Sequence, residues 1–175
     1  MDVPTRTRNG IVSSVHAAPD DPTEGTVKAR QRLSFGPMKS KHFLSLDDAR
    51  AAAAAAESEA LKAGWAVSIA IADDGGHLLW LQRLDGAAPV SAEIAVAKAR
   101  TAALGRRETK GYEDMINQGR TAFLSVPLLQ GMLEGGVPIV VAGHCVGAVG
   151  VSGVKSPEDA QVARAGVAAL VGAGG

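Results

Sequence analysis

The chain has little cysteine and few aromatic residues: its 175 residues include one cysteine, Cys145, and six aromatic side chains. A single cysteine excludes a disulfide framework and a cysteine-based metal cluster. Lys and Arg number 18, as do Asp and Glu, so the formal net charge is zero and no basic excess marks a nucleic-acid binder. The few aromatic rings also leave little surface for stacking single-stranded bases. We therefore expect no nucleic-acid partner.

Long apolar segments are missing as well. No run approaches the roughly 18 apolar residues that a membrane helix needs. The first ten residues, MDVPTRTRNG, contain no apolar stretch of the kind found in a signal peptide. The length suits one domain, since domains typically have about 100–200 residues. We expect a soluble, cytoplasmic protein without membrane contact.

Alanine and glycine are abundant instead, with 32 and 21 copies. The segment LSLDDARAAAAAAESEALKAG predicts a helix that begins after an N-cap at Ser45 and ends at Gly64. A second helix is predicted over 91–104, with Ser91 as its N-cap. Both helices have inner faces made mostly of alanine, so they must pack closely and leave part of the sheet uncovered. A subunit partner would supply that cover, and we expect a homo-oligomer.

Residues 1–43 differ in composition from the rest of the chain. They hold seven Lys or Arg against four Asp or Glu, contain four of the eight prolines, and show no sustained period of either two or 3.6. This composition is typical of a flexible arm. The alternative is an arm that packs on a neighbouring subunit through Ile11-Val12 and Leu33-Ser34-Phe35. We place the folded domain at 44–175.

The domain alternates helices with hairpins. The segments WAVSIAIA (65–72) and HLLWLQRL (77–84) predict two strands joined by a turn. About three more are predicted within 121–133, 137–142 and 145–151, and Ser156 begins a final helix. Strands joined by hairpins form an antiparallel sheet, which makes the fold class α+β.

Three motifs carry a family resemblance: AIADDGGHLLWLQRLDGAAPVSAEIAVAKARTAALGRR, GGVPIVVAGHCVGAVGVSG and SPEDAQVARAG. Together they resemble the GlcG-like family, also called haem-degrading or HbpS-like, over about 44–172. The resemblance implies a profilin-like domain with a five-stranded antiparallel sheet, usually assembled into homo-oligomers. It also implies haem binding in some members, and gene neighbourhoods of glycolate or aromatic breakdown in others. This chain departs from the family at Ala142, where an Asp often precedes the Gly of the last hairpin turn.

The first functional hypothesis is a catabolic enzyme that binds a small unsaturated organic acid and transforms it by general acid–base chemistry, such as hydrolysis or tautomerisation. No cofactor is expected for such a reaction. Lys98 is ambiguous, because an alanine-rich neighbourhood either demands an anionic partner or lets the side chain extend to solvent. We expect catalytic roles for Lys98, Glu93, Asp73 and His144, and binding of the small anion by Arg83, Asp85, Gly135 and Gly136.

The second hypothesis is a haem- or tetrapyrrole-binding protein without catalysis. Haem needs an apolar slot and an axial ligand such as His. Two histidines lie in or beside the arm, His16 and His42, and the other two, His77 and His144, lie at turns. We expect exposed or turn-capping roles for all four, with ligand contact at His77 or His144 as the alternative. No metal site other than haem is indicated.

Overall fold

The computed structural model describes residues 36–172, so the anchors expected at 11–12 and 33–35 lie outside the described residues. The chain divides into two units, Met1–Met38 and Lys39–Gly175, and the fold is that of the second. Its elements in chain order are α1 (Leu46–Ala63), β1 (Ser68–Asp73), β2 (Leu78–Arg83), α2 (Val90–Gly105), α3 (Lys110–Asn117), the short 3₁₀ helix η1 (Thr121–Ser125), β3 (Gly136–Val141), β4 (His144–Ser152) and α4 (Ser156–Val171).

The strands form one antiparallel sheet in the order β2-β1-β4-β3. The class is α+β as predicted, but the sheet of the described residues has four strands, and the expectation of five is wrong. The missing strand is the one predicted within 121–133, where η1 and an extended loop are found. Pro127 lacks the backbone donor that a strand needs, and the side chains around it are largely exposed. The profilin-like architecture stays a prediction.

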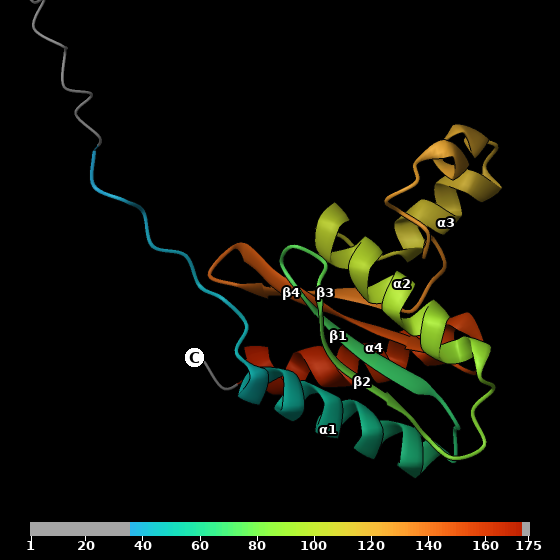
Figure 1. Cartoon of the computed structure of the whole chain (residues 1–175). Helices are drawn as coiled ribbons and strands as arrows, with labels where there is room; N and C mark the ends of the chain where they lie inside the picture. Colours follow the sequence, from blue (N-terminus) through green and yellow to red (C-terminus); the bar gives the residue numbers. More distant parts are fainter. Residues whose placement is uncertain (1–35, 173–175) are drawn as a thin grey trace, which may run out of the picture. The chain divides into compact units, whose positions relative to one another are not determined.

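Helices cover both faces of the sheet (Figure 1): α1 and α4 lie together on one face, and α2 lies on the other. The face toward α1 and α4 carries large apolar side chains, among them Ile69, Ile71 and Val149, all fully buried. The face toward α2 carries small ones, such as Ala70 and Ala72 of β1. Strand alternation separates these two sets, because successive side chains point to opposite faces.

The predicted start and end of α1 are confirmed. The Ser45 hydroxyl accepts a hydrogen bond from the Asp48 amide at 3.1 Å, and the Asp48 carboxylate accepts one from the Ser45 amide at 2.9 Å. This reciprocal arrangement satisfies two backbone donors at the helix N-terminus. Gly64 ends the helix with a left-handed φ of 70°.

The predicted N-cap of α2 is wrong. The helix begins at Val90 after Pro89, and no side chain caps it. The Ser91 hydroxyl instead donates to the Ala88 carbonyl oxygen at 2.6 Å and lies 2.7 Å from the hydroxyl of buried Ser68. Ser91 thus joins the helix to β1, a tertiary role that local sequence does not reveal.

Close packing of α2 on the sheet is confirmed and depends on glycine. A Cβ atom added to Gly150 of β4 would overlap the backbone of Ala95 and Ala99, and one added to Gly136 of β3 would overlap the backbone of Lys98. The helix therefore rests on the sheet with backbone against backbone. Glycine is required because no other residue lacks the side chain that would separate the two.

Candidate functional site

A mainly apolar slot of about 410 Å³ lies between the segment preceding α1, the first turns of α1, the hairpin β3–β4 and the end of α4. Ten residues line it: His42, Phe43, Leu44, Asp48, Ala51, Ile139, Val141, Val146, Ala169 and Leu170. Seven of the ten are aliphatic and one is aromatic. A volume of about 300–1,000 Å³ with a mainly apolar lining is typical of small-molecule sites.

Only two side chains of the slot are ionisable. Asp48 is engaged in capping α1, and the hydrogen bonds it accepts from the Ser45 side chain and backbone lower the pKa of its carboxyl group. It therefore remains an anion in neutral solution. His42 is exposed, and within the described residues its imidazole makes no hydrogen bond to a protein group, which leaves both ring nitrogens free.

The wall that carries His42 is tied to the turn between β1 and β2. The Lys41 ammonium group donates to the Asp74 carboxylate at 2.6 Å. In that turn, Asp73 accepts hydrogen bonds from the backbone of Gly75 at 2.9 Å and of His77 at 2.8 Å, and the His77 ring lies 3.2 Å away. Burial alone would raise the pKa of Asp73, but these hydrogen bonds outweigh it and lower the pKa. Asp73, predicted to move protons, is an anion that organises a turn.

A second cluster lies inside the domain around Lys98. Its ammonium group donates to the Asp159 carboxylate at 2.7 Å and to the Val151 carbonyl oxygen at 3.0 Å. The side chains of Lys98 and Asp159 are each 3% exposed, and the Val154 amide also donates to Asp159 at 3.2 Å. Burial outweighs the neighbouring ammonium group and raises the pKa of Asp159. The pair joins α2, β4 and α4, and neither residue lines the slot.

Of the predicted site residues, Lys98 and Gly135 are brought together. A Cβ atom added to Gly135 would lie 2.8 Å from the Lys98 ammonium nitrogen, and the φ of 123° at Gly135 also favours glycine. The Gly136 amide, predicted to bind an anion, already donates to the Thr109 hydroxyl at 2.8 Å. Gly135 therefore leaves room for the Lys98 side chain, and the Gly136 amide fixes the start of β3 to Thr109.

The other predicted residues are dispersed. Arg83 and Asp85 are exposed at the end of β2, on the opposite edge of the sheet from β3, and form no ion pair among the described residues. Glu93 is exposed on α2. Asp73 and His144 lie at the other end of the strands from Arg83, and His144 is exposed as the first residue of β4.

Sequence analysis missed two residues that the structure makes important, Asp159 and His42. Asp159 lies in the first turn of α4, where an acidic residue is common because it interacts favourably with the helix dipole. Its presence there therefore did not indicate a buried partner. His42 was grouped with the arm because of its composition. The apolar pair that follows it, Phe43-Leu44, was the available indication of a wall.

The comparisons with known proteins agree on one family. Residues 44–168 match the family model described as haem degrading protein HbpS-like. Protein GlcG of Escherichia coli K12 is 64% identical over 115 residues, which cover 66% of this chain and 85% of GlcG. A crystal structure of a double mutant of Streptomyces reticuli HbpS is 36% identical with a TM-score of 0.71, covering 81% of this chain and 97% of that one.

A further solved structure carries a ligand in its description. The crystal structure described as a PduOC:heme complex has a TM-score of 0.65 and 27% identity, and covers 73% of this chain and 95% of that chain. The fold defines a small α+β domain with a mainly apolar slot. The chain belongs to the HbpS-like family. No helix of residues 36–172 has the length and apolar character to span a membrane.

Proposed function

We propose that this protein binds haem or a related metal tetrapyrrole in the slot, with His42 as the axial ligand. The observation that carries the proposal is an apolar cavity of about 410 Å³ whose wall presents an imidazole without a protein partner. The haem named in the description of the related PduOC complex supports the same ligand class.

The residues of the slot fit this group. Haem requires apolar walls for its ring and a nitrogen, sulfur or oxygen donor for its iron. Ile139, Val146 and Leu170 supply apolar wall, and His42 supplies the nitrogen. No group of three or more His, Cys, Asp or Glu side chains within residues 36–172 is arranged to hold a metal ion by itself, so the iron would enter with its ring.

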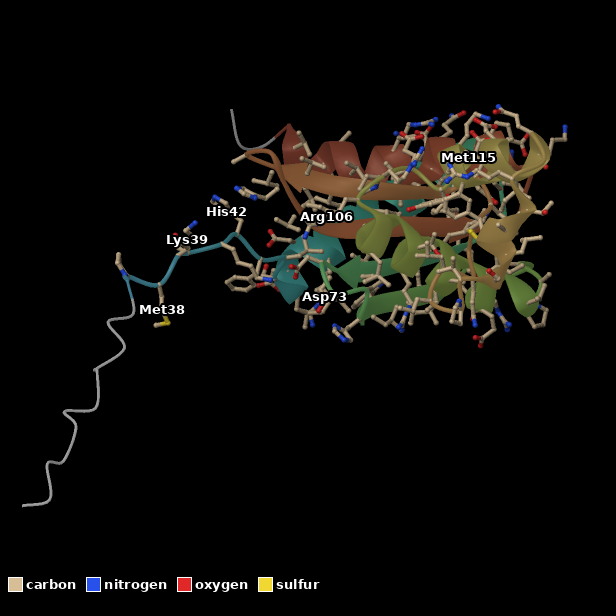
Figure 2. All side chains as sticks on the ribbon, turned by 90° about the horizontal axis from the view of Figure 1, so that it is seen from above. Met38, Lys39, His42, Asp73, Arg106 and Met115 are labelled. Carbon is tan, nitrogen blue, oxygen red and sulfur yellow. The ribbon has the colours of Figure 1, made fainter. Side chains whose placement is uncertain are left out.

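Each wall has a defined task in this proposal. His42 would hold the iron, and the aliphatic side chains and Phe43 would supply apolar contact to the ring. Lys39, exposed on the same segment as His42 (Figure 2), provides a cation for a propionate. When bound, haem supplies redox and gas-binding chemistry that the protein side chains lack. Asp48, held anionic by its cap, keeps one border of the slot polar and disfavours a propionate there.

The test is an optical titration with haemin. We expect a saturable Soret shift at one haemin per chain for the wild type, and an at least tenfold weaker affinity for His42→Ala. Two histidines exposed at turns provide matched controls, His77→Ala and His144→Ala, and both should bind as the wild type does. A response without saturation, or a His42→Ala variant with wild-type affinity and spectrum, would overturn the proposal.

The enzyme hypothesis has a separate observation in its favour. A cavity of about 270 Å³ beside α2 is lined by Ala97, Arg100, Pro127, Leu128 and Gln130. A guanidinium group beside an amide suits the carboxylate of a small unsaturated organic acid. None of the predicted catalytic residues lines this cavity, so the proposal here is limited to binding. Calorimetric titration with fumarate or maleate should show saturable heat that Arg100→Gln abolishes, and no heat with either acid would exclude it.

A further inference from the structure

We infer that Asp74 is a positioning residue for the slot: through its ion pair with Lys41 it holds the His42 wall closed and slows departure of the ligand. The inference rests on the proposed function of the slot. It concerns the segment 41–44, called here the strap, which runs from Lys41 to the buried Leu44 immediately before α1.

The strap is fixed at its two ends. At one end, Leu44 is 8% exposed and belongs to the apolar core, and the next residue, Ser45, is locked into the cap of α1. At the other end, the Lys41 ammonium group meets the Asp74 carboxylate at 2.6 Å. His42 and Phe43 lie between these anchors and line the slot, with Phe43 73% exposed. The wall of the slot is therefore a short span held at both ends.

Asp74 belongs to a turn that is itself well held. The Gly76 amide donates to the Asp73 carbonyl oxygen at 3.0 Å, and the Asp73 amide donates to the His77 carbonyl oxygen at 2.9 Å. The Asp73 carboxylate adds the hydrogen bonds described above. Gly76 has a φ of 76°, and a Cβ atom added there would lie 3.1 Å from the side chain of Leu104 on α2. Asp74 thus connects the strap to a rigid part of the sheet.

The Lys41–Asp74 ion pair links the strap, which forms one wall of the slot, to a distant part of the sheet. The β1–β2 turn is 33 residues from Lys41 along the chain, and no other hydrogen bond between the side chains of residues 39–43 and the sheet occurs within the described residues. In Figure 2, His42, Asp73 and Arg106 lie toward one end of the domain and Met115 toward the other. Lys41 therefore provides the one side-chain link between the strap and the β1–β2 turn within the described residues.

We expect loss of the Lys41–Asp74 ion pair to raise the rate of haemin dissociation moderately, by an amount that depends on salt concentration. The Lys41 and Asp74 side chains are 67% and 34% exposed, and ion pairs exposed to this degree contribute little because water and salt screen them. We expect haemin to dissociate about two- to fivefold faster from Asp74→Asn than from the wild type at low salt. Raising the salt concentration should accelerate dissociation from the wild type and leave Asp74→Asn nearly unchanged.

The experiment measures haemin transfer from the loaded full chain to an excess of a haem-scavenging apoprotein. Lys41→Gln should behave as Asp74→Asn does, and the reversed pair, Lys41→Asp with Asp74→Lys, should restore slow dissociation. Both single variants should keep the wild-type Soret band because His42 remains the ligand. Asp114→Asn is the matched control, since it breaks an exposed ion pair of similar geometry, Lys110–Asp114 at 2.9 Å, on α3.

A second measurement does not depend on haem. Backbone ¹⁵N relaxation of the ligand-free protein should show greater mobility of the strap in Asp74→Asn, and unchanged mobility in Asp114→Asn. Failure of the wild type to bind haemin would refute the proposed function, while this relaxation experiment would still test the strap. Wild-type dissociation and wild-type strap mobility in Asp74→Asn would overturn the inference, as would a reversed pair that dissociates as fast as the single variants.

Discussion

The Lys98 ammonium group lies 2.7 Å from the Asp159 carboxylate, 61 residues further along the chain, and both side chains are 3% exposed. Two charges removed from water in this way are tolerated because they neutralise each other and because the Val151 carbonyl oxygen and the Val154 amide satisfy their remaining hydrogen bonds. Removing one partner leaves the other charge buried and unpaired, whereas removing both leaves an apolar gap.

This asymmetry gives the first prediction. Lys98→Met should lower the free energy of unfolding by about 3–5 kcal/mol, as expected when one partner of a buried pair is lost. The double variant Lys98→Met with Asp159→Leu should recover most of that loss, because no unpaired charge remains. Urea unfolding followed by circular dichroism measures both. A loss below about 1 kcal/mol in the single variant, together with abolished turnover of a substrate, would instead favour the catalytic role predicted for Lys98.

The cap of α1 gives a prediction of pH dependence. The pKa of Asp48 is lowered in the folded state, so its contribution to stability is present above its unfolded pKa near 3.8 and is lost as pH falls through the lower, folded value. Asp48→Asn should cost about 0.3–1 kcal/mol at pH 7, because it removes a negative charge from the first turn of α1. The difference from the wild type should shrink steadily below pH 4 in thermal or urea unfolding. A difference that stays constant from pH 7 to pH 2 would contradict this account.

The hairpin between β3 and β4 is strained at Ala142. The turn residues are Ala142 and Gly143, one position earlier than predicted, and their φ angles are 48° and 78°. A left-handed conformation costs a residue with a Cβ about 1–2 kcal/mol. Ala142→Gly should therefore raise the free energy of unfolding by about 1 kcal/mol. The exposed Ala54 of α1 provides the opposite control, since Ala54→Gly should lower stability by about 1 kcal/mol. Equal effects of the two changes would refute the assignment of strain.

Helix α2 leaves part of its face of the sheet exposed, and we predict that a second subunit covers this part. On β2, Leu78 and Leu81 are 47% and 42% exposed and are paired with Ala72 and Ala70, which face α2. A second subunit packed there would bury these leucines. Light scattering at micromolar concentration should show an oligomer for the wild type and a smaller species for Leu81→Lys. Lys62→Gln, an exposed change at the end of α1, should leave the mass unchanged. A monomeric wild type would contradict the prediction.

Much of the fold could be predicted from sequence because its signals are local. The Ser45 cap, the glycine at the end of α1 and the hairpin around Gly75-Gly76 each depend on neighbouring residues. The segment 121–133 could not be assigned, because an apolar run interrupted by Pro127 fits a strand and a loop equally well. The N-cap expected at Ser91 failed for a different reason: its hydroxyl is used by Ser68, which lies on another element.

The candidate site was harder to predict than the fold because its parts meet only in three dimensions. The alanine-rich neighbourhood of Lys98 left open whether this side chain meets an anionic partner or extends to solvent, and nothing along the chain singled out Asp159. The slot combines residues separated by more than 120 positions, from His42 to Leu170. The composition of residues 1–43 assigned His42 to the arm, whereas in the structure it lines the slot.

The backbone contact between α2 and β4 means that the two faces of the sheet differ in which substitutions they tolerate. Beneath α2, any side chain at Gly150 meets the helix backbone, so this position has almost no freedom to vary. On the opposite face, side chains and not backbone form the boundary of the slot, among them Ile139, Val146 and Leu170. Variants meant to change what the slot accepts therefore belong on the face of α1 and α4, whereas Gly136 and Gly150 beneath α2 should stay glycine.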